Sequence, residues 1–444
     1  MNYEKIKSII LTLLVAISVL LTWNVWTYQP NYDVIGEDYT PGVMIGTEKT
    51  YKDVFKPYKV LFHQNQATFG TVDDIEIAKM MENLSNWNFY ELSEVGKDLS
   101  QSEFEWLVHG DKRVEILFPD IISFDILRSL LNFEEKKLPS ESIDRIVIDT
   151  SNVNNDTSNV YFVSYNDQLV FKGQIKSAFL TTFNEDFVAN SDKHPRYFAE
   201  EVAKSHKIFL PEKPIDFPSY RYVLEEINTQ TFRDALFSDP NGVTKEFTND
   251  GEQFTDGKSL MELDVNNQIL TYVNPIYEET GSSTTTSVLI QESFNFVNEH
   301  GGWVDQFQYF KISNVERKIV YRQFINGLPV FNESGMAELS YVLGNKEIYR
   351  YQRPYTRRGF PLDSESENGV TLMSGYEVLN YLNSQEDIDT SLIEDIAIGY
   401  KLSRDIDLKN QNIIIYKPTW YYLYAGGWLP IIPEEMGGTN NGLE

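Results

Sequence analysis

Two stretches of ten residues decide the fold: "NNQILTYVNP" at 266–275 and "NKEIYRYQRP" at 345–354. They share Asn, Ile, Tyr and Pro at identical spacing, and each follows a strand-like run that contains Glu-Leu. Alternating apolar residues that end at a turn-forming residue are typical of one arm of a β-hairpin. The repetition therefore predicts a duplicated unit that contains antiparallel strands.

Helical segments precede both copies of this stretch. They are "TFRDALF" at 231–237 and "LIQESFNFVN" at 289–298, and the second places Ile290, Phe294 and Val297 on one face. The Ser/Thr-rich "TGSSTTTS" at 280–287 is the expected linker between the copies. Each copy is thus predicted to be a helix followed by an antiparallel sheet.

The second copy is extended toward the carboxyl terminus. Ser374 and Glu377 form a capping-box pattern ahead of a helix. The later stretch "TWYYLY" at 419–424 alternates as a strand, with Trp420, Tyr422 and Tyr424 on one face.

The amino-terminal half mixes helical and strand patterns. Helices are expected within 72–87 and 124–131, where Ile77, Met81 and Leu84 share one face of the first. Strands are expected at 145–150 and 160–165, on either side of a polar insert. The insert lacks the glycine and the closing glutamate of a calcium loop, so it is expected to be a solvated hairpin loop. Three prolines in 210–220 indicate a domain boundary near residue 215.

One stretch near the amino terminus is apolar enough to cross a membrane. The run from Ser8 to Tyr32 has no charged side chain, and about 20 apolar residues suffice for one spanning helix. It ends in aromatic residues that suit a membrane interface and lacks the cleavage site of a signal peptide. Lys5 and Lys7 precede it, so we expect a cytoplasmic tail over 1–7, an anchor over 8–28 and all later residues outside, starting with an irregular stalk over 33–58.

Five small or hydroxyl-bearing residues share one side of this anchor when it is drawn as a helix. They are Ser8, Thr12, Ala16, Ser18 and Thr22. Small residues let helices approach closely in a bilayer, and hydroxyls bond across the interface. The pattern predicts a face that packs against other membrane helices. The alternative is an inert tether whose hydroxyls bond their own helix backbone.

Composition excludes several classes of function. The formal net charge of −28 disfavours binding to nucleic acid. The absence of cysteine excludes disulfides, thiolate zinc sites and cysteine nucleophiles. The stability of the chain must therefore come from packed cores.

The sequence contains no strong catalytic or metal-binding motif. "GEQFTDGKS" at 251–259 resembles a phosphate-binding loop but has five residues where that loop needs four, which favours a hairpin turn. The five histidines, at 63, 109, 194, 206 and 300, include no pair at the i, i+4 spacing of a helical metal site. No serine-nucleophile signature occurs. We expect no enzyme, no cofactor and no metal site, although a carboxylate pair far apart in sequence would be invisible to such a search.

One cluster of positive charge departs from the acidic background. The stretch "YRYQRPYTRRGF" at 349–360 contains Arg350, Arg353, Arg357 and Arg358. Arginine and tyrosine are favoured in interfaces, so these arginines are predicted to dock an acidic protein partner or an anionic wall polymer. The alternative is a solvated strand edge whose arginines pair with the chain's own acids. On a strand, Arg350 would face away from Arg353.

Several segments together resemble one known family. The anchor that leads into "YQPNY" is followed, in order, by "FNFVNEHGGW" at 294–303, "YRQFINGLPVFNESG" at 321–335, "IAIGY" at 396–400 and "PTWYYLYAGGW" at 418–428. In this combination the chain resembles the YycH family of Gram-positive bacteria. The segment 321–331 is also similar to the strand-turn-strand of small PepSY-like domains, in agreement with the hairpin unit.

The resemblance implies a single-pass accessory regulator. Such a protein acts with its relative YycI on the sensor histidine kinase WalK, whose two-component pathway with WalR governs cell-wall metabolism. The resemblance implies neither catalytic residues nor a cofactor. An extracytoplasmic protein that binds or hydrolyses cell-wall polymers is the alternative.

The predicted fold class is α+β. One amino-terminal transmembrane helix is followed by about three extracytoplasmic α+β domains, of which the last two share the helix and antiparallel-sheet unit of PepSY and YycI type. The expected domains span 33–212, 213–280 and 288–432, and a disordered tail is expected over 433–444.

Overall fold

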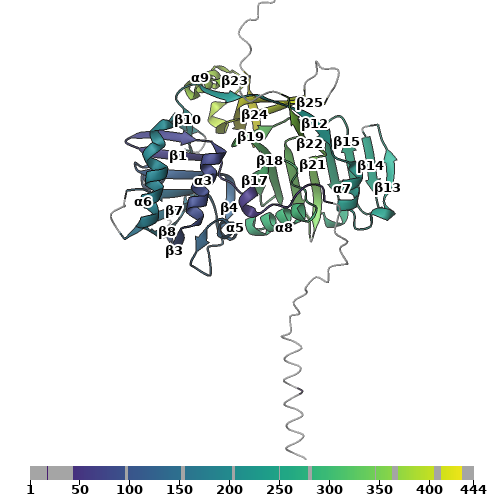
Figure 1. Cartoon of the computed structure of the whole chain (residues 1–444), viewed down its shortest axis with the longest axis horizontal. Coiled ribbons are helices and arrows are strands. Elements are labelled where there is room, and N and C mark those ends of the chain that lie inside the picture. Colours follow the sequence, from purple (N-terminus) through teal and green to yellow (C-terminus); the bar gives the residue numbers. More distant parts are fainter. Residues whose placement is uncertain are drawn as a thin grey trace, which may run out of the picture. The chain divides into compact units, whose positions relative to one another are not determined.

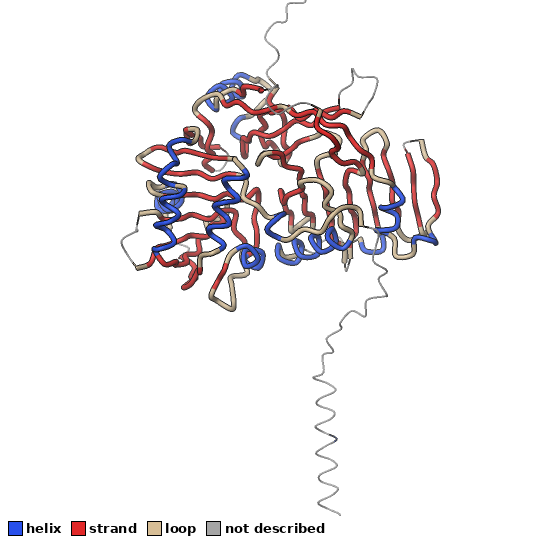
Figure 2. The backbone as a smooth tube through the Cα atoms, in the orientation of Figure 1, coloured by secondary structure: helices blue, strands red, loops and turns tan. Residues whose placement is uncertain are grey.

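Strands dominate the part of the chain that the structure describes, and helices pack beside them (Figures 1 and 2). The computed structural model describes Ser18 and residues 44–95, 99–151, 156–202, 206–249, 251–278, 283–345, 347–362, 369–404 and 412–432. Those from Met44 onward belong to one compact unit. The predicted α+β class is confirmed. No helix among the described residues has the length and apolar character needed to span a membrane.

The first sheet has ten strands in the order β10-β9-β2-β1-β4-β6-β7-β8-β3-β5. They are β1 (Lys59–Gln64), β2 (Ala67–Thr71), β3 (Asn88–Val95), β4 (Arg113–Ser123), β5 (Asn132–Phe133), β6 (Ser142–Asp149), β7 (Thr157–Ser164), β8 (Leu169–Lys176), β9 (Arg196–Val202) and β10 (His206–Pro211). Strands β6 and β7 form the antiparallel hairpin that the sequence predicts. Within its polar insert, residues 152–155 lie outside the described residues.

Helices cover both faces of this sheet because its central strands bury apolar side chains on both sides. Helices α3 (Asp74–Ser85) and α6 (Ser177–Asp186) lie on one face (Figure 1). On the other face, α4 (Gln101–His109) packs Phe104 and Val108 against Val147 and Val163. The short helices α2 (Tyr51–Val54), α5 (Phe124–Leu130) and η1 (Val188–Lys193) complete this half.

The second sheet has 14 strands, and its main path runs β13-β14-β15-β16-β21-β20-β18-β19-β24-β25-β12-β22, with β17 on β18 and β26 on β25. They are β12 (Tyr220–Glu226), β13 (Thr244–Phe247), β14 (Gly251–Thr255), β15 (Leu260–Asp264), β16 (Ile269–Val273), β17 (Phe307–Ser313), β18 (Lys318–Ile325), β19 (Leu328–Phe331), β20 (Glu338–Leu343), β21 (Ile348–Pro354), β22 (Thr356–Pro361), β24 (Ile393–Arg404), β25 (Ile413–Tyr424) and β26 (Gly427–Ile431). Strands β11 (Ile215–Pro218) and β23 (Gly369–Leu372) form a separate pair. The helices of this half are α7 (Thr229–Leu236), α8 (Thr286–Glu299), α9 (Gly375–Ser384), η3 (Pro240–Gly242), η4 (Pro275–Tyr277) and η5 (Thr390–Leu392).

The same order of elements occurs twice around the repeated stretch. Helix α7 is followed by the antiparallel strands β13, β14, β15 and β16, and α8 is followed by β17, β18, β20 and β21, with β19 inserted. The last strands of the two sets, β16 and β21, pair antiparallel and place Tyr272 opposite Tyr351. These tyrosines occupy equivalent positions in the repeated stretch, so the pairing has a local two-fold character.

This pairing joins the two segments that the sequence places in separate domains, 213–280 and 288–432. Strand β16 pairs with β21, and β12 lies between β25 and β22. Pairing satisfies the backbone N–H and C=O groups that the edge of a four-stranded sheet would otherwise leave open. Both sheets also contribute to one hydrophobic core, which contains Ile116 of β4 as well as Tyr309 of β17.

Residues 44–58 pack against the folded unit. The ring of Tyr51 stacks on Phe294 with centroids 4.1 Å apart, Val54 and Phe55 are fully buried, and the Ile45 N–H donates to the His300 carbonyl. The predicted stalk is therefore wrong for these residues, because apolar and aromatic side chains among the prolines and glycines bury themselves against α8. Residues 33–43 of the predicted stalk lie outside the described residues.

The stretch that resembles a phosphate-binding loop is a hairpin turn, as predicted. It joins β14 to β15, and Asp256 Oδ1 accepts the N–H groups of Lys258 and Ser259. Gly257 adopts a φ of 82°, which favours glycine. The backbone amides of this turn are thus directed at a side chain of the turn itself.

Candidate functional site

Most of the predicted membrane face lies outside the described residues. Ser8, Thr12, Ala16 and Thr22 are among the residues without a described position. Ser18 is described, and it is helical and exposed. The membrane-packing face therefore stays a prediction.

Arg353 lies inside the protein rather than on a docking surface. Its side chain is fully buried, and it donates to the carbonyl oxygens of Gly302 and Pro354 at 2.9 and 3.1 Å. The guanidinium carbon is 5.1 Å from the ring centroid of Phe232. The prediction that Arg353 docks a partner is wrong, because the alternation of β21 turns Arg353 into the core and leaves Arg350 exposed.

The other two arginines of this stretch pair with acids of the same chain. The Arg357 Nε donates to Glu225 Oε2 at 3.0 Å, and Arg358 Nε is 3.7 Å from Asp305 Oδ1. The Arg357 side chain is 52% exposed, whereas that of Arg358 is 16% exposed. These contacts agree with a strand edge paired with its own acids. Partner docking by Arg350, Arg357 and Arg358 stays a prediction.

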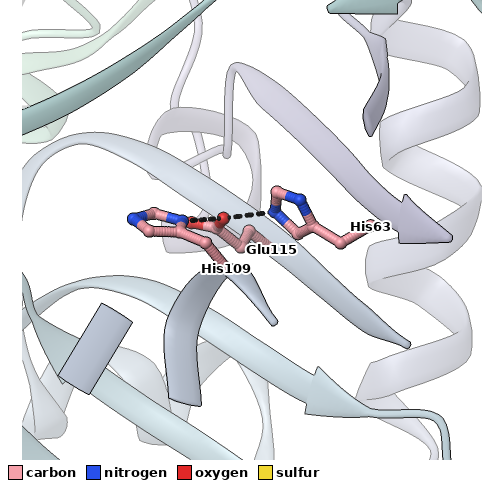
Figure 3. Close-up of side chains that lie close together, drawn as sticks. All are labelled: His63, His109 and Glu115. Carbon is pink, nitrogen blue, oxygen red and sulfur yellow. Dashed lines mark hydrogen bonds and ion pairs between the residues drawn. The ribbon is translucent and has the colours of Figure 1, made fainter. Parts of the chain in front are cut away.

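A cluster that the sequence did not reveal lies inside the first sheet. It brings together His63 from β1, His109 from the last turn of α4 and Glu115 from β4 (Figure 3). Glu115 Oε1 is 2.6 Å from His63 Nε2 and 2.6 Å from His109 Nδ1. The three side chains are 5%, 8% and 0% exposed, so the cluster is closed to bulk water.

A second set of side chains surrounds these three. His63 Nδ1 is 2.9 Å from the Thr68 hydroxyl, and His109 Nε2 is 2.8 Å from the Tyr165 hydroxyl. The other carboxylate oxygen of Glu115 accepts from Arg145 at 3.0 Å. Every nitrogen and oxygen of the two imidazoles and the carboxylate therefore has a partner.

Arg145 connects the cluster to a second carboxylate. Its Nη2 donates to Asp144 at 3.0 Å, and its guanidinium lies 3.9 Å from the ring centroid of Tyr165. Burial alone would lower the pKa of Arg145, but Asp144 and Glu115 outweigh it and raise the pKa. The guanidinium therefore stays charged inside the protein.

The charge state of the carboxylate follows from its neighbours. Burial alone would raise the pKa of Glu115, but the charges and hydrogen bonds of His109 and His63 outweigh it and hold that pKa well below its usual range. Burial lowers the pKa of His109, and Glu115 opposes that effect. The arrangement is thus an ionised carboxylate that accepts N–H groups from two imidazoles. Such a group can hold a proton or a metal cation.

One sequence signal could have pointed to this cluster. His63 ends the apolar run "KVLFH" and Glu115 interrupts "RVEILF", and a polar residue on a buried strand needs a partner. The partners are 52 residues apart in the chain, and His109 lies on a helix between them. A search for metal ligands at helical spacing could not connect them.

The fold and this site define the class of protein: an α+β protein with two extensive sheets, a repeated helix and sheet unit, and ionisable groups that face one another in an enclosed cluster. Residues 4–191 match the family profile described as "YycH protein, N-terminal domain", and residues 205–435 match "YycH protein, C-terminal domain". The chain belongs to the YycH family.

Two known proteins extend this assignment. The "Two-component system WalR/WalK regulatory protein YycH" of Bacillus subtilis (strain 168) is 26% identical over 461 aligned residues, which cover all of both chains. The crystal structure of YycH from Bacillus subtilis matches with a TM-score of 0.74 at 23% sequence identity, covering 87% of this chain and 98% of that one. The second comparison supports the fold.

Proposed function

We propose that this protein is a non-enzymatic, membrane-anchored regulator of the WalR/WalK two-component system, and that it acts with YycI in controlling cell-wall metabolism. The observation that carries the proposal is the relation along the entire chain to the WalR/WalK regulatory protein of Bacillus subtilis. Both family domains occur here in the same order. A relation of this extent includes the membrane-proximal segment as well as the folded unit.

The decisive experiment is genetic. A strain that lacks the gene for this chain is complemented with the full chain or with an empty vector, and a WalR-dependent promoter reports the output of the kinase. We expect complementation to return reporter output to the parental level. Unchanged output upon deletion and complementation would reject the regulatory role.

The anchor over 8–28 is proposed to contact WalK and YycI through Ser8, Thr12, Ala16, Ser18 and Thr22. Replacing residues 8–28 by an unrelated single-pass anchor of equal length and orientation should abolish regulation at an equal protein level. Returning Thr12, Ala16, Ser18 and Thr22 to that anchor should restore it. Full regulation by the chimera that carries the unrelated anchor would mean that the segment acts only as a tether.

The exposed arginines are proposed to form a second contact, on the outside of the membrane. Arg350 lies in β21 and Arg357 lies in β22, and both are exposed, which makes them accessible to an acidic partner. Reversing both charges, with Arg350→Glu and Arg357→Glu, should weaken co-purification with YycI or WalK in a salt-dependent manner. The matched control is Arg196→Glu, which reverses an exposed arginine paired with Glu212 on the first sheet. Equal recovery of partners from both variants would show that these arginines do not contribute to the interface.

The competing class is a protein that binds or hydrolyses cell-wall polymers. A binding assay distinguishes such a protein from a regulator. The full chain in detergent is incubated with purified peptidoglycan and with teichoic acid. A regulator that recognises proteins should leave both polymers unbound and intact. Retention on the polymer, or release of soluble fragments, would favour the competing class.

A further inference from the structure

The cluster of His63, His109 and Glu115 has the composition of a metal site. Each side chain offers one ligand atom, and the three atoms lie within 4.8 Å of one another. Two imidazoles and one carboxylate are a ligand set found at zinc and iron sites in proteins. We propose that these three side chains bind one divalent transition-metal ion, with zinc as the reference ion and a water molecule as the fourth ligand.

The three ligand atoms already converge on one point. Both imidazole nitrogens that face Glu115 are 2.6 Å from the same carboxylate oxygen. In a tetrahedral site with ligands about 2.0 Å from zinc, neighbouring ligand atoms are about 3.3 Å apart. Metal entry therefore requires each of these two separations to widen by several tenths of an ångström. The side chain of His109 can move at the end of α4, and the side chains of His63 and Glu115 can separate by rotation about their own bonds, so the pairing of β1 with β4 is not disturbed.

The outer contacts allow each imidazole to move its hydrogen to the other ring nitrogen and to turn a lone pair toward a metal. In the hydrogen-bonded form, each imidazole donates to Glu115 and its other nitrogen accepts from a hydroxyl, of Thr68 or of Tyr165. In the metal-bound form, the nitrogen that faces Glu115 must offer its lone pair and the other nitrogen must carry the hydrogen. A hydroxyl can donate or accept, so both outer contacts persist when the hydrogen moves. Outer contacts of this kind orient the ligands of metal sites.

The charge of the cluster favours a cation. Glu115 and Asp144 supply two negative charges, and Arg145 supplies one positive charge, which leaves one net negative charge when the imidazoles are neutral. Arg145 holds the carboxylate oxygen that does not face the imidazoles and shares its charge with Asp144. The oxygen aimed at the imidazoles is therefore available as a ligand.

The enclosure of the site defines what the metal would do. Phe209 packs against the rings of both His63 and His109, with centroid distances of 5.2 and 5.1 Å. A metal in this position would tie together β1, β4 and the end of α4, and it would be shielded from substrates by the aromatic ring. The proposed ion thus stabilises the first half of the protein and makes that stability dependent on metal supply.

The test uses the full chain in detergent micelles, freed of metal by a chelator that is then removed. Titration with Co²⁺ should produce the intense visible absorption of a four-coordinate site, saturating at one ion per chain, and Zn²⁺ should displace it. Zn²⁺ should also raise the melting temperature, since a ligand bound only by the folded state stabilises that state. Mg²⁺ should do neither, because it prefers octahedral oxygen ligands.

The variants separate this site from adventitious binding by surface carboxylates. His109→Gln should weaken Co²⁺ binding by more than about 100-fold, and Tyr165→Phe should weaken it by about tenfold or more. The matched control is His194→Gln, because His194 contacts a single carboxylate among the described residues, that of Glu76 at 3.1 Å, and its replacement should leave Co²⁺ affinity unchanged. Circular dichroism of the metal-free variants reports folding. If His109→Gln does not fold, Thr68→Val tests the site through an outer contact, with an expected loss of about tenfold.

Two results would overturn the proposal. One is the absence of four-coordinate Co²⁺ absorption and of a Zn²⁺-dependent melting shift in the unmodified chain. The other is equal Co²⁺ affinity in the His109→Gln and His194→Gln variants, which would assign the binding to surface groups.

Discussion

Glu115 in the first sheet and Arg353 in the second are both fully buried charged side chains, and they are stabilised in opposite ways. Glu115 faces a guanidinium and two imidazoles. Arg353 faces two carbonyl oxygens, the Tyr351 hydroxyl and the ring of Phe232. Its Nη2 has no hydrogen-bond partner among the described residues.

The two buried charges depend on their surroundings in different ways. In the first sheet, every member of the network stabilises the others, so the loss of one leaves buried charges without compensation. In the second sheet, the hydrogen-bond partners of Arg353 are neutral groups and the Asp305 carboxylate acts on it through space, so removing the charge leaves mainly unpaired carbonyl oxygens. Substitutions in the two places should therefore have unequal effects on stability.

The largest effect is expected for Arg145→Met. This change removes the only guanidinium that contacts the buried Glu115 among the described residues, and the expected loss is about 3 to 5 kcal/mol of unfolding free energy. Urea unfolding of the full chain, followed by tryptophan fluorescence, measures it. Lys207→Met is the control, because its ion pair with Glu105 is more exposed, at 29% and 27%, and should contribute less than about 1 kcal/mol. Similar losses in the two variants would contradict the network interpretation.

An intermediate effect, dependent on pH, is expected at His206. Its Nδ1 contacts the Asn166 side-chain oxygen at 3.2 Å and no carboxylate of the described residues, and burial, together with the nearby Arg145, lowers the pKa of His206 from 6.5 to about 4. As the pH falls, the unfolded chain therefore gains a proton before the folded chain does, so stability decreases between about pH 6.5 and pH 4.

His206→Gln should remove that part of the pH dependence. At pH 7.5 the variant and the unmodified chain should have similar free energies of unfolding. At pH 4 the free energy of unfolding of the variant should be higher than that of the unmodified chain, by an amount on the order of 2 kcal/mol. Urea unfolding at both pH values gives the comparison. Parallel pH profiles for the two chains would show that the fold does not depress the pKa of this imidazole.

Arg353→Met should cost less than Arg145→Met. The carbonyl oxygens of Gly302 and Pro354 would lose their donor, which costs about 1 to 2 kcal/mol, while the buried charge itself disappears. The same unfolding assay measures it. A loss as large as that of Arg145→Met would mean that neutral dipoles hold a buried charge as tightly as opposite charges do.

The smallest effect is expected at the surface. Arg357→Ala breaks an ion pair whose arginine is 52% exposed, and it should change the unfolding free energy by less than about 1 kcal/mol. The difference should shrink further in high salt, because exposed charges are screened. A larger, salt-independent loss would indicate that Arg357 contributes to packing rather than to a surface ion pair.

Several elements were predictable because their signals are local. Helix α3 buries Ile77 and Leu84 as its periodicity predicts, although Met80 is more deeply buried than the predicted Met81. The capping box of Ser374 and Glu377 begins α9. Helical and strand periods and caps depend on neighbours within a few residues, and those neighbours are readable in the chain itself.

The arginine-containing stretch 349–360 is a case in which local sequence patterns cannot predict which side chains are buried. Its alternation correctly separates Arg350 from Arg353, but the identity of the buried face depends on what packs against the sheet. Helix α7 supplies Phe232, and the end of α8 leads to Gly302, which together enclose Arg353. No pattern within 349–360 contains that information.

Patterns in the sequence were sufficient to predict the α+β class, the repeated helix and sheet unit, many of the element positions and the relation to the YycH family. The pairing of β16 with β21, the burial of Arg353 and the meeting of His63, His109 and Glu115 became known from the folded chain. The two groups of features differ in the range of the interactions that produce them. Turns, caps and periodic faces arise between residues close in the chain, whereas sheet pairing and a closed polar cluster arise between residues that only the packing of the complete fold brings together.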